Sequence, residues 1–313
     1  MSVHPPSAVD RPGSRSPRDD AILFAVMDDM RHTLRTSWID PALRSVSSHP
    51  LFFTAAWAAT KPNMTRSFAL GTEQLRLAAI DAVRAIHSVG PPVRAGNGTG
   101  ARTAGGPAAP TANGSALDTL TATERERLIR TVQAVHNASA KVSVVLQAWT
   151  ALALRRRLPG TGQEEPPAKR GIPSWQEGLG TMPRSLPSEA EALVDDATIG
   201  LGLTTTPFAL QAIAAWPRFL EESWRRLLPA TRSLQWTDAT AGLRRRATDV
   251  LRSLPHPMDL QWDVLGRRGL TEDRREALGD HLAMLGAAMP VNMLVAAHLW
   301  VVLGSPEPPG DAG

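Results

Sequence analysis

Histidine and cysteine build most metal sites and many nucleophilic centres in proteins, but their pattern in this sequence supports neither. The 313 residues include no cysteine, which excludes disulfides, thiolate zinc sites, iron–sulfur clusters and thiol nucleophiles. The eight histidines are scattered, without a His-x-His, His-x-x-x-His or Glu-x-x-His pair. His136, beside Asn137, is the histidine that we most expect to be buried, as a core residue or as a ligand. We therefore predict no metal site and no cofactor.

Two further catalytic patterns are also missing from the sequence. No glycine-rich loop follows a strand pattern, so the phosphate cradle of nucleotide-binding proteins is not indicated. A serine nucleophile of the α/β-hydrolase kind needs a strand–turn–helix elbow, and the sequence has no strand-like alternation of Val, Ile and Thr. Neither nucleotide binding nor serine-triad chemistry is expected.

One tryptophan differs from its neighbours in a way that favours a pocket. Four others lie on apolar faces as two pairs related by an internal repeat, which core packing explains: Trp57, Trp149, Trp224 and Trp300. Trp38 has no such mate, because Thr205 stands at the corresponding position of the second half. A large aromatic side chain unique to one half could line a pocket or simply belong to the core.

Apolar residues recur at helical spacings of three and four along most of the chain. These segments are 18–35, 66–88, 121–137, 141–154, 188–201, 234–253, 271–287 and 290–303, with shorter helices broken at Pro50 and Pro217. Helix-capping residues support the predicted starts of three of these helices. Thr121 and Glu124 form a capping box, and Ser188 and Thr271 each precede an acidic first turn. The sequence predicts an all-α fold.

Segments rich in Pro, Gly, Ala and Ser divide the chain. We predict disordered tails at 1–17 and 305–313, a flexible insertion at about 90–117 and a Pro-rich linker at 158–187. The linker is long enough to wrap around the outside of the molecule. Between these segments, residues 18–157 and 188–304 are expected to form two helical units.

The two helical units repeat one another. Ala42-Leu43, His49-Pro50 and Trp57 of the first unit correspond to Ala209-Leu210, Trp216-Pro217 and Trp224 of the second, each 167 residues later. The Leu-Thr-x-x start at Leu120, leading to Trp149, recurs at Leu270, leading to Trp300, with a one-residue slip. This order predicts two pseudo-symmetric repeats packed around a central cleft, where a shared site would lie.

Charge and hydropathy exclude other classes of partner. The formal net charge is +4. The two arginine clusters, at 155–157 and 244–246, lack the interleaved aromatic residues of a nucleic-acid site. A basic helical nucleic-acid binder would instead gather its arginines on one face. No run of eighteen apolar residues occurs, and residues 1–20 have no signal-peptide core, so we expect a cytoplasmic protein that does not span a membrane.

Two motifs, 33–38 (Thr-Leu-Arg-Thr-Ser-Trp) and 212–217 (Ala-x-x-Ala-Trp-Pro), resemble the group I 2-haloacid dehalogenases. The resemblance extends to the repeat order, the Pro-rich linker and the start of the last helix pair. It implies two all-helical repeats around a central cleft, usually in a homodimer. It also implies a cofactor-independent hydrolase that acts on both enantiomers of short 2-halocarboxylic acids.

In the family that the sequence resembles, an aspartate activates a water that attacks C2 directly and expels halide with inversion. An asparagine helps to place this water, and a tryptophan shapes the pocket. Carried over residue by residue, the tryptophan is Trp38, the asparagine position is Ser139, and the aspartate position, seven residues before Trp216-Pro217, is Ala209, preceded by Phe208. The resemblance implies that Trp38, Ser139, Phe208 and Ala209 line the substrate pocket.

Alanine cannot accept a proton, and loss of a general base costs about 10²–10⁴-fold in rate. Asp40 is the best-placed substitute, two residues before Ala42, the repeat-mate of Ala209. Asp immediately before Pro41 is also typical of a plain helix N-cap. The sequence thus leaves two functions: a hydrolase of small carboxylic acids with its usual base replaced, or a non-catalytic protein that binds a small carboxylate or a partner.

Overall fold

The computed structural model describes residues 17–89, 115–179 and 186–305. Within these ranges the chain is helical, with two isolated β-bridges and no strand, so the predicted all-α class is confirmed. The α-helices are α1 (Pro17–Leu34), α2 (Pro41–Val46), α3 (Pro50–Thr60), α4 (Arg66–Val89), α5 (Ala122–Ala153), α6 (Ser188–Gly200), α7 (Phe208–Ile213), α8 (Pro217–Thr231), α9 (Leu234–Arg252), α10 (Trp262–Arg267) and α11 (Glu272–Val302). Three short 3₁₀ helices are η1 (Lys61–Asn63), η2 (Ala116–Thr119) and η3 (Ser174–Gln176).

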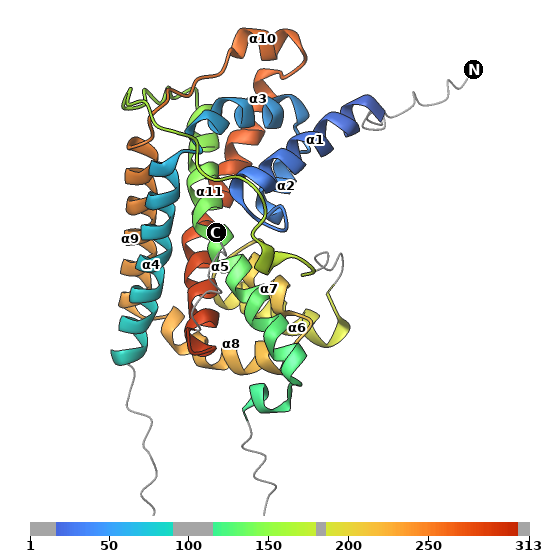
Figure 1. The fold of residues 1–313 in the computed structure, drawn as a ribbon, viewed down its shortest axis with the longest axis vertical. Helices are drawn as coiled ribbons and strands as arrows, with labels where there is room; N and C mark the ends of the chain where they lie inside the picture. The colour runs from blue at the N-terminus through green and yellow to red at the C-terminus, as the bar shows by residue number, and fades with distance from the viewer. Residues whose placement is uncertain (1–16, 90–114, 180–185, 306–313) are drawn as a thin grey trace, which may run out of the picture.

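Two long helices, α5 and α11, run through the centre of the molecule (Figure 1). Every residue from 291 to 300 of α11 is buried, as is most of the second half of α5. In α5, Trp149 is fully buried and meets the rings of Phe52 and Phe53 from α3 edge-on, with centroids 6.2 and 5.4 Å away. Helices α4 and α9 lie on one side of the pair and α6 and α7 on the other, and α8 runs across its lower end (Figure 1). The pair is thus the scaffold on which the remaining helices pack.

The predicted breaks at 138–140 and 288–289 are wrong, because α5 and α11 each continue through them. In α5 the Ser139 hydroxyl donates to the carbonyl of His136 at 3.0 Å, a bond that a helix accommodates. In α11 Pro290 lies inside the helix, where it removes one hydrogen bond to the carbonyl four residues earlier. The buried turns that follow hold the helix together.

Helix α11 is long and apolar enough to cross a membrane by length and composition, although no such helix was expected. Its most apolar window is 72% buried inside the protein, which is typical of the core helix of a soluble protein. The mean hydropathy of this helix therefore reflects its central position.

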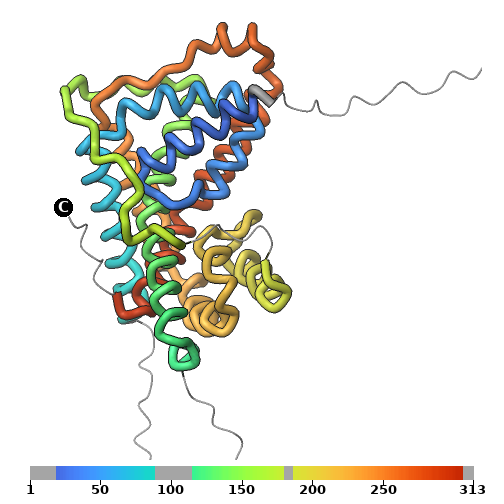
Figure 2. The backbone as a smooth tube through the Cα atoms, turned by 45° about the vertical axis from the view of Figure 1, so that its right-hand side comes forward, coloured from blue at the N-terminus to red at the C-terminus, as the bar shows by residue number. Residues whose placement is uncertain are grey.

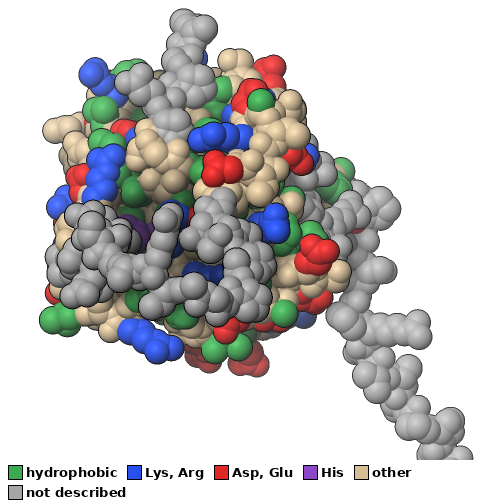
Figure 3. All heavy atoms as spheres, turned by 90° about the horizontal axis from the view of Figure 1, so that it is seen from below, with side chains coloured by type: hydrophobic (Ala, Val, Ile, Leu, Met, Phe, Trp, Pro, Cys, Tyr) green, Lys and Arg blue, Asp and Glu red, His purple; other side chains and the backbone are tan. Residues whose placement is uncertain are grey.

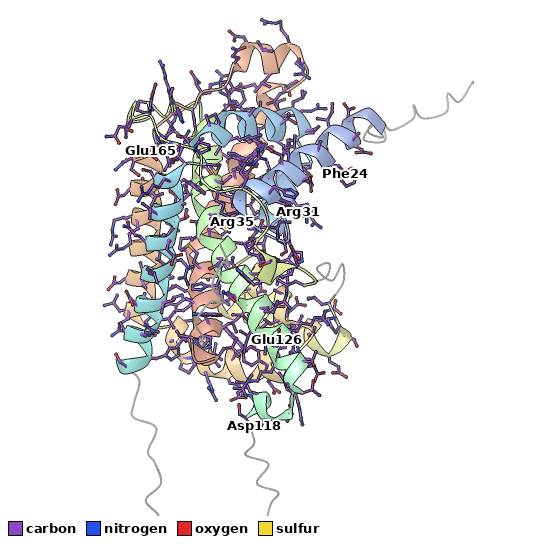
Figure 4. The ribbon with its side chains drawn as sticks, viewed as in Figure 1. Phe24, Arg31, Arg35, Asp118, Glu126 and Glu165 are labelled. Carbon is purple, nitrogen blue, oxygen red and sulfur yellow. The ribbon has the colours of Figure 1, made fainter. Side chains whose placement is uncertain are left out.

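The linker packs against both halves of the chain. Leu158 exchanges two backbone hydrogen bonds with Met258, at 3.1 and 2.8 Å. Farther along, Ala168 donates to the carbonyl of Met64 at 2.9 Å and Gly171 to that of His32 at 2.8 Å. Glu165 accepts two hydrogen bonds from Ser67 and lies beside one end of α4 (Figure 4). Figure 2 shows this segment, in yellow-green, running down one side of the helices.

Most of the predicted tails and of the insertion lie outside the described residues. The end of the insertion is described, and there Ser115 caps η2 by accepting a hydrogen bond from the backbone of Leu117. Ser305 likewise continues from α11, with its backbone N–H donating to the carbonyl of Trp300 at 3.0 Å.

Several local features recur 167 residues apart. Helices α2 and α7 begin and end at matching positions, and the residues before Pro50 and Pro217 share an unusual backbone conformation, with φ and ψ of −111° and 72° at His49 and −122° and 71° at Trp216. The indole of Trp57 donates to Asp29 at 2.7 Å, and the indole of Trp224 donates to Asp196 at 2.8 Å. We propose on this basis that the two halves are copies of one ancestral unit.

A chain of hydrogen bonds, running from exposed His87 to buried His298, joins α4, α8 and α11. His298 is fully buried, and its Nε2–H donates to the carbonyl of Ser223 at 3.0 Å. Its Nδ1 must then be an acceptor, and it receives a hydrogen bond from Nε2 of His87 at 2.9 Å. Burial lowers the pKa of His298 to about 3, with the nearby His87 as a second cause. His298 is therefore neutral wherever the protein is folded at moderate pH.

The buried state of His298 predicts a pH-dependent stability. Since its pKa is lower in the folded than in the unfolded chain, its contribution is complete above pH 6.5 and is lost as the pH falls towards 3. One such group changes the free energy of unfolding by about 1.4 kcal/mol per pH unit in this window. Between pH 6.5 and 5 the parent should lose about 2 kcal/mol more than His298→Gln, as measured by urea unfolding. Equal losses in the two proteins would contradict the prediction.

Candidate functional site

A cavity of about 170 Å³ lies where the two halves of the chain meet, against one side of α11. The first half contributes the start of α2, and the second half contributes the segment 203–208 and the start of α7. The side of α11 that closes the cavity carries His281 and Asn292. Among the described residues that line the cavity, Asp40 is the one carboxylate, and the others are apolar or neutral polar groups and His281. The cavity is much smaller than the roughly 300–1,000 Å³ of drug-sized sites, so it suits a small ligand.

Asp40 both caps a helix and faces this cavity. Its Oδ1 accepts a hydrogen bond from the backbone N–H of Ala42 at 2.8 Å, which starts α2 at Pro41. Its Oδ2 is buried and has no hydrogen-bond partner among the described residues. Since Asp40 is only 3% exposed, this second oxygen is shielded from solvent. The helix-cap interpretation is thus confirmed, and the role of Asp40 as a substitute base stays a prediction.

Burial sets the proton affinity of Asp40. Removing the carboxylate from water raises its pKa to about 6, and the hydrogen bond from Ala42 opposes this only in part. No lysine or arginine of the described residues lines the cavity to stabilise the negative charge. A carboxyl group with a pKa near 6 is ionised at neutral pH and is a stronger base than an exposed aspartate.

Two side-chain hydrogen bonds tie α11 to the elements that carry the cavity. The Oδ1 of Asn292 accepts from the backbone N–H of Ala209 at 3.2 Å and so fixes the first turn of α7. The hydroxyl of Ser45 donates to the carbonyl of Ala42 at 2.8 Å, so it accepts from Nε2–H of His281, also at 2.8 Å. These bonds hold α2 and α7 at fixed places over the central helix.

The loop between α1 and α2 is fixed by the linker and by α5. Gln176, only 3% exposed, accepts from the backbone N–H of Ser37 at 2.8 Å and from its hydroxyl at 2.9 Å. The same amide donates to the carbonyl of Arg35 at 3.2 Å, where φ is +57°. Lys141 donates to the carbonyl of Leu34 at 2.7 Å. These contacts determine where Trp38 and Asp40 emerge from the loop.

The residues predicted from the sequence lie at different distances from the cavity. Phe208 lines it, and Trp38 meets the ring of Phe208 edge-on with centroids 6.3 Å apart. Ala209 is fully buried and is not among the lining residues, but its backbone N–H donates to Asn292, which does line the cavity. Ser139 is buried in α5, bonded to its own helix, and is not among the lining residues. The substrate-binding role of these four residues stays a prediction.

Three residues of the site were not identified from the sequence: Asn292, His281 and Gln176. A signal for Asn292 existed, because an amide inside the apolar run 290–303 needs a buried partner. His281 and Gln176 lie in ordinary polar contexts, and only the packing of α11 and of the linker brings them to the site. The sequence predicted no metal site, and the described residues contain no group of three or more His, Asp or Glu side chains that could hold a metal ion.

Comparison with known proteins identifies the fold. No protein-family model matches the chain, and no curated protein matches it by sequence. A D-2-haloacid dehalogenase in complex with L-LA matches with a TM-score of 0.73 and 16% identity, over 97% of this chain and 99% of that chain. A D-2-haloacid dehalogenase mutant with D-2-CPA matches with a TM-score of 0.70 and 16% identity, over 94% and 95% of the two chains. The chain therefore has the helical fold of these dehalogenases over nearly its whole length.

The buried Asp40 predicts that removing its charge stabilises the protein. A raised pKa means that its contribution to stability is complete below pH 3.8 and is lost as the pH rises through 6. The amide oxygen of an asparagine can still accept the hydrogen bond from the backbone N–H of Ala42, without carrying a charge. At pH 8, Asp40→Asn should raise the free energy of unfolding by about 3 kcal/mol, with little change at pH 4, in urea unfolding at the two pH values. A variant that is less stable than the parent at pH 8 would show that the ionised carboxylate is not strained.

Proposed function

We propose that this protein is a cofactor-independent hydrolase of small 2-halocarboxylic acids, distantly related to the 2-haloacid dehalogenases, with Asp40 as its general base. The observation that carries the proposal is the unpartnered Oδ2 of Asp40 at a small cavity between the two halves. The dehalogenase fold of the chain agrees with this chemistry.

The reaction requires only a base, a water and a place for the acid. Oδ2 of Asp40 takes a proton from a water while the water oxygen attacks C2 of the substrate from the side opposite the halogen. The new C–O bond forms as the carbon–halogen bond breaks, and the halide leaves with the bonding electron pair. The products are the 2-hydroxy acid, with inverted configuration, and the halide. The proton stays on Asp40 until it passes to solvent.

The cavity offers groups suited to each part of such a substrate. Amide and hydroxyl side chains, those of Gln211, Thr205, Thr206 and Asn292, can donate hydrogen bonds to a carboxylate. Phe208, backed by Trp38, and Leu285 form an apolar wall against which a short carbon chain and a halogen can pack. The carboxylate of Asp40 is itself buried, which raises its proton affinity and so strengthens the proposed base.

Asp40 replaces, in this proposal, an aspartate that the resemblance places at position 209. Ala209 has no proton-accepting group and its side chain is fully buried. Asp40 and Phe208 line the same cavity, so a base on either side of it could reach the same water. The proposal therefore transfers the base from the second half of the chain to the first.

Halide release from racemic 2-chloropropionate and 2-bromopropionate tests this assignment. The parent should release halide, and Asp40→Asn should lower kcat by about 10²–10⁴-fold with the fold retained. The matched control is Asp196→Asn, which changes a carboxylate to an amide far along the sequence, where the amide can still accept from Trp224. The control should keep the activity of the parent.

A second variant separates the possible failures. Under the proposal, Ala209→Asp gives no activity beyond that of the parent. A silent parent with an active Ala209→Asp would show that the pocket survives and that Asp40 is not its base. Silence in both would favour the alternative, a protein that binds a small carboxylate or a partner without turnover.

The pKa of Asp40 predicts the pH profile. Because the base must be ionised, kcat/KM for halide release should rise with pH and level off above a midpoint near 6. A rate measured between pH 4.5 and 8.5 in buffers of constant ionic strength checks this. A midpoint near 4, the value of an exposed aspartate, would contradict a buried base.

A further inference from the structure

A second cavity, of about 430 Å³, lies between α4, α5 and α11 and shares no lining residue with the Asp40 cavity. Leu77 and Ile80 of α4 and Trp300 of α11 form its apolar walls. Gln133 and Asn137, one turn apart on α5, supply amide groups. Nothing in the proposed hydrolysis uses these residues.

Gln133 is the group in this cavity that most needs a partner. Its side chain is 3% exposed, and both Nε2 and Oε1 are buried without a hydrogen-bond partner among the described residues. Buried amides are nearly always hydrogen-bonded, since an unmet donor or acceptor is strongly unfavourable. The carboxamide thus presents an unused donor and an unused acceptor side by side.

His136, one turn along α5 from Gln133 and just behind the lining residues, carries a second unused donor. The guanidinium of Arg76 lies 3.3 Å from Nδ1 of His136, and since arginine only donates, the neutral ring carries its hydrogen on Nε2. This Nε2 is buried and has no partner in the described part of the chain. Burial lowers the pKa of His136 to about 3, which keeps the ring neutral. Its centroid is 6.1 Å from that of Trp300, a wall of the cavity.

The charged residues around the cavity cancel one another. Arg76 pairs with Glu73 at 2.6 Å, and Arg84 and Asp81 also line the cavity. Two cations and two anions give no net attraction for a charged ligand. The deep polar groups, Gln133 and His136, are neutral as well.

We propose that this cavity binds a small neutral molecule that carries a primary amide or a lactam on a planar apolar ring. Such a group places a hydrogen-bond acceptor next to a donor, which complements the free carboxamide of Gln133, and its acceptor can also meet Nε2–H of His136. The ring packs against Trp300, Leu77 and Ile80. The polar atoms that the fold leaves unpaired are then the recognition groups of a binding site.

Benzamide, which combines a primary amide with a planar ring, is the probe that tests this site. Titration calorimetry should show one molecule bound per chain, with a Kd on the order of 1 mM or lower for a ligand of this size. Gln133→Leu keeps the approximate volume and removes both unpaired atoms, so it should weaken binding at least tenfold while remaining as stable as the parent. Loss of affinity without loss of stability is the result expected of a recognition residue.

Three controls make the test decisive. Gln147→Leu alters a glutamine of the same helix that bonds to α9 instead, and it should bind benzamide as the parent does. Benzoate, which has no donor at neutral pH, should bind at least tenfold more weakly than benzamide. Asp40→Asn should leave benzamide binding unchanged, so the result does not depend on the proposed hydrolase activity. Absence of benzamide binding at 10 mM, or equal affinity in Gln133→Leu and the parent, would overturn the proposal.

Discussion

The burial of the Asp40 carboxylate is the constraint around which the two halves of the chain are arranged. One oxygen accepts a hydrogen bond from the first turn of α2, the other is buried without a partner among the described residues, and the residue lines a cavity whose opposite wall belongs to the second half. A lone buried charge is unfavourable, and its pKa near 6 measures that strain. Proteins keep such groups at functional sites, because an exposed aspartate would be too weak a base. The stability lost here is supplied by the apolar core around α5 and α11.

That core explains why the site can be small and well defined. The second half of α5 and residues 291–300 of α11 are buried on nearly all sides, so these helices cannot shift without disrupting the whole interior. Asn292 projects from α11 to the first turn of α7, and His281 projects to Ser45 near the end of α2. Apart from Asp40, no Asp, Glu, Lys or Arg of the described residues is fully buried, and Figure 3 shows basic and acidic side chains interspersed over one face of the molecule. The described surface in this view has no extended basic patch of the kind that a nucleic-acid binder needs.

Much of the fold could be predicted from local sequence, because helices depend on apolar spacing and on caps such as Thr121 and Thr271. The breaks expected within α5 and α11 were wrong, since burial can carry a helix through a proline. Asp40 was identified, but its second oxygen could be assigned only once the cavity was known. Asn292, His281 and Gln176 are brought to the site by contacts between segments distant in sequence, which a single sequence does not encode locally.

The linker has a consequence for how the chain reaches this structure. Its bonds connect residues far apart in sequence, with 139 positions between Ser37 and Gln176 and 98 between Ser67 and Glu165. Closing loops of this length carries an entropic cost that is recovered only after the helices it spans are in place. Docking of the linker and fixing of the loop that presents Trp38 and Asp40 therefore depend on one another. Whatever order the helices follow, the position of that loop is set only when the linker is in place.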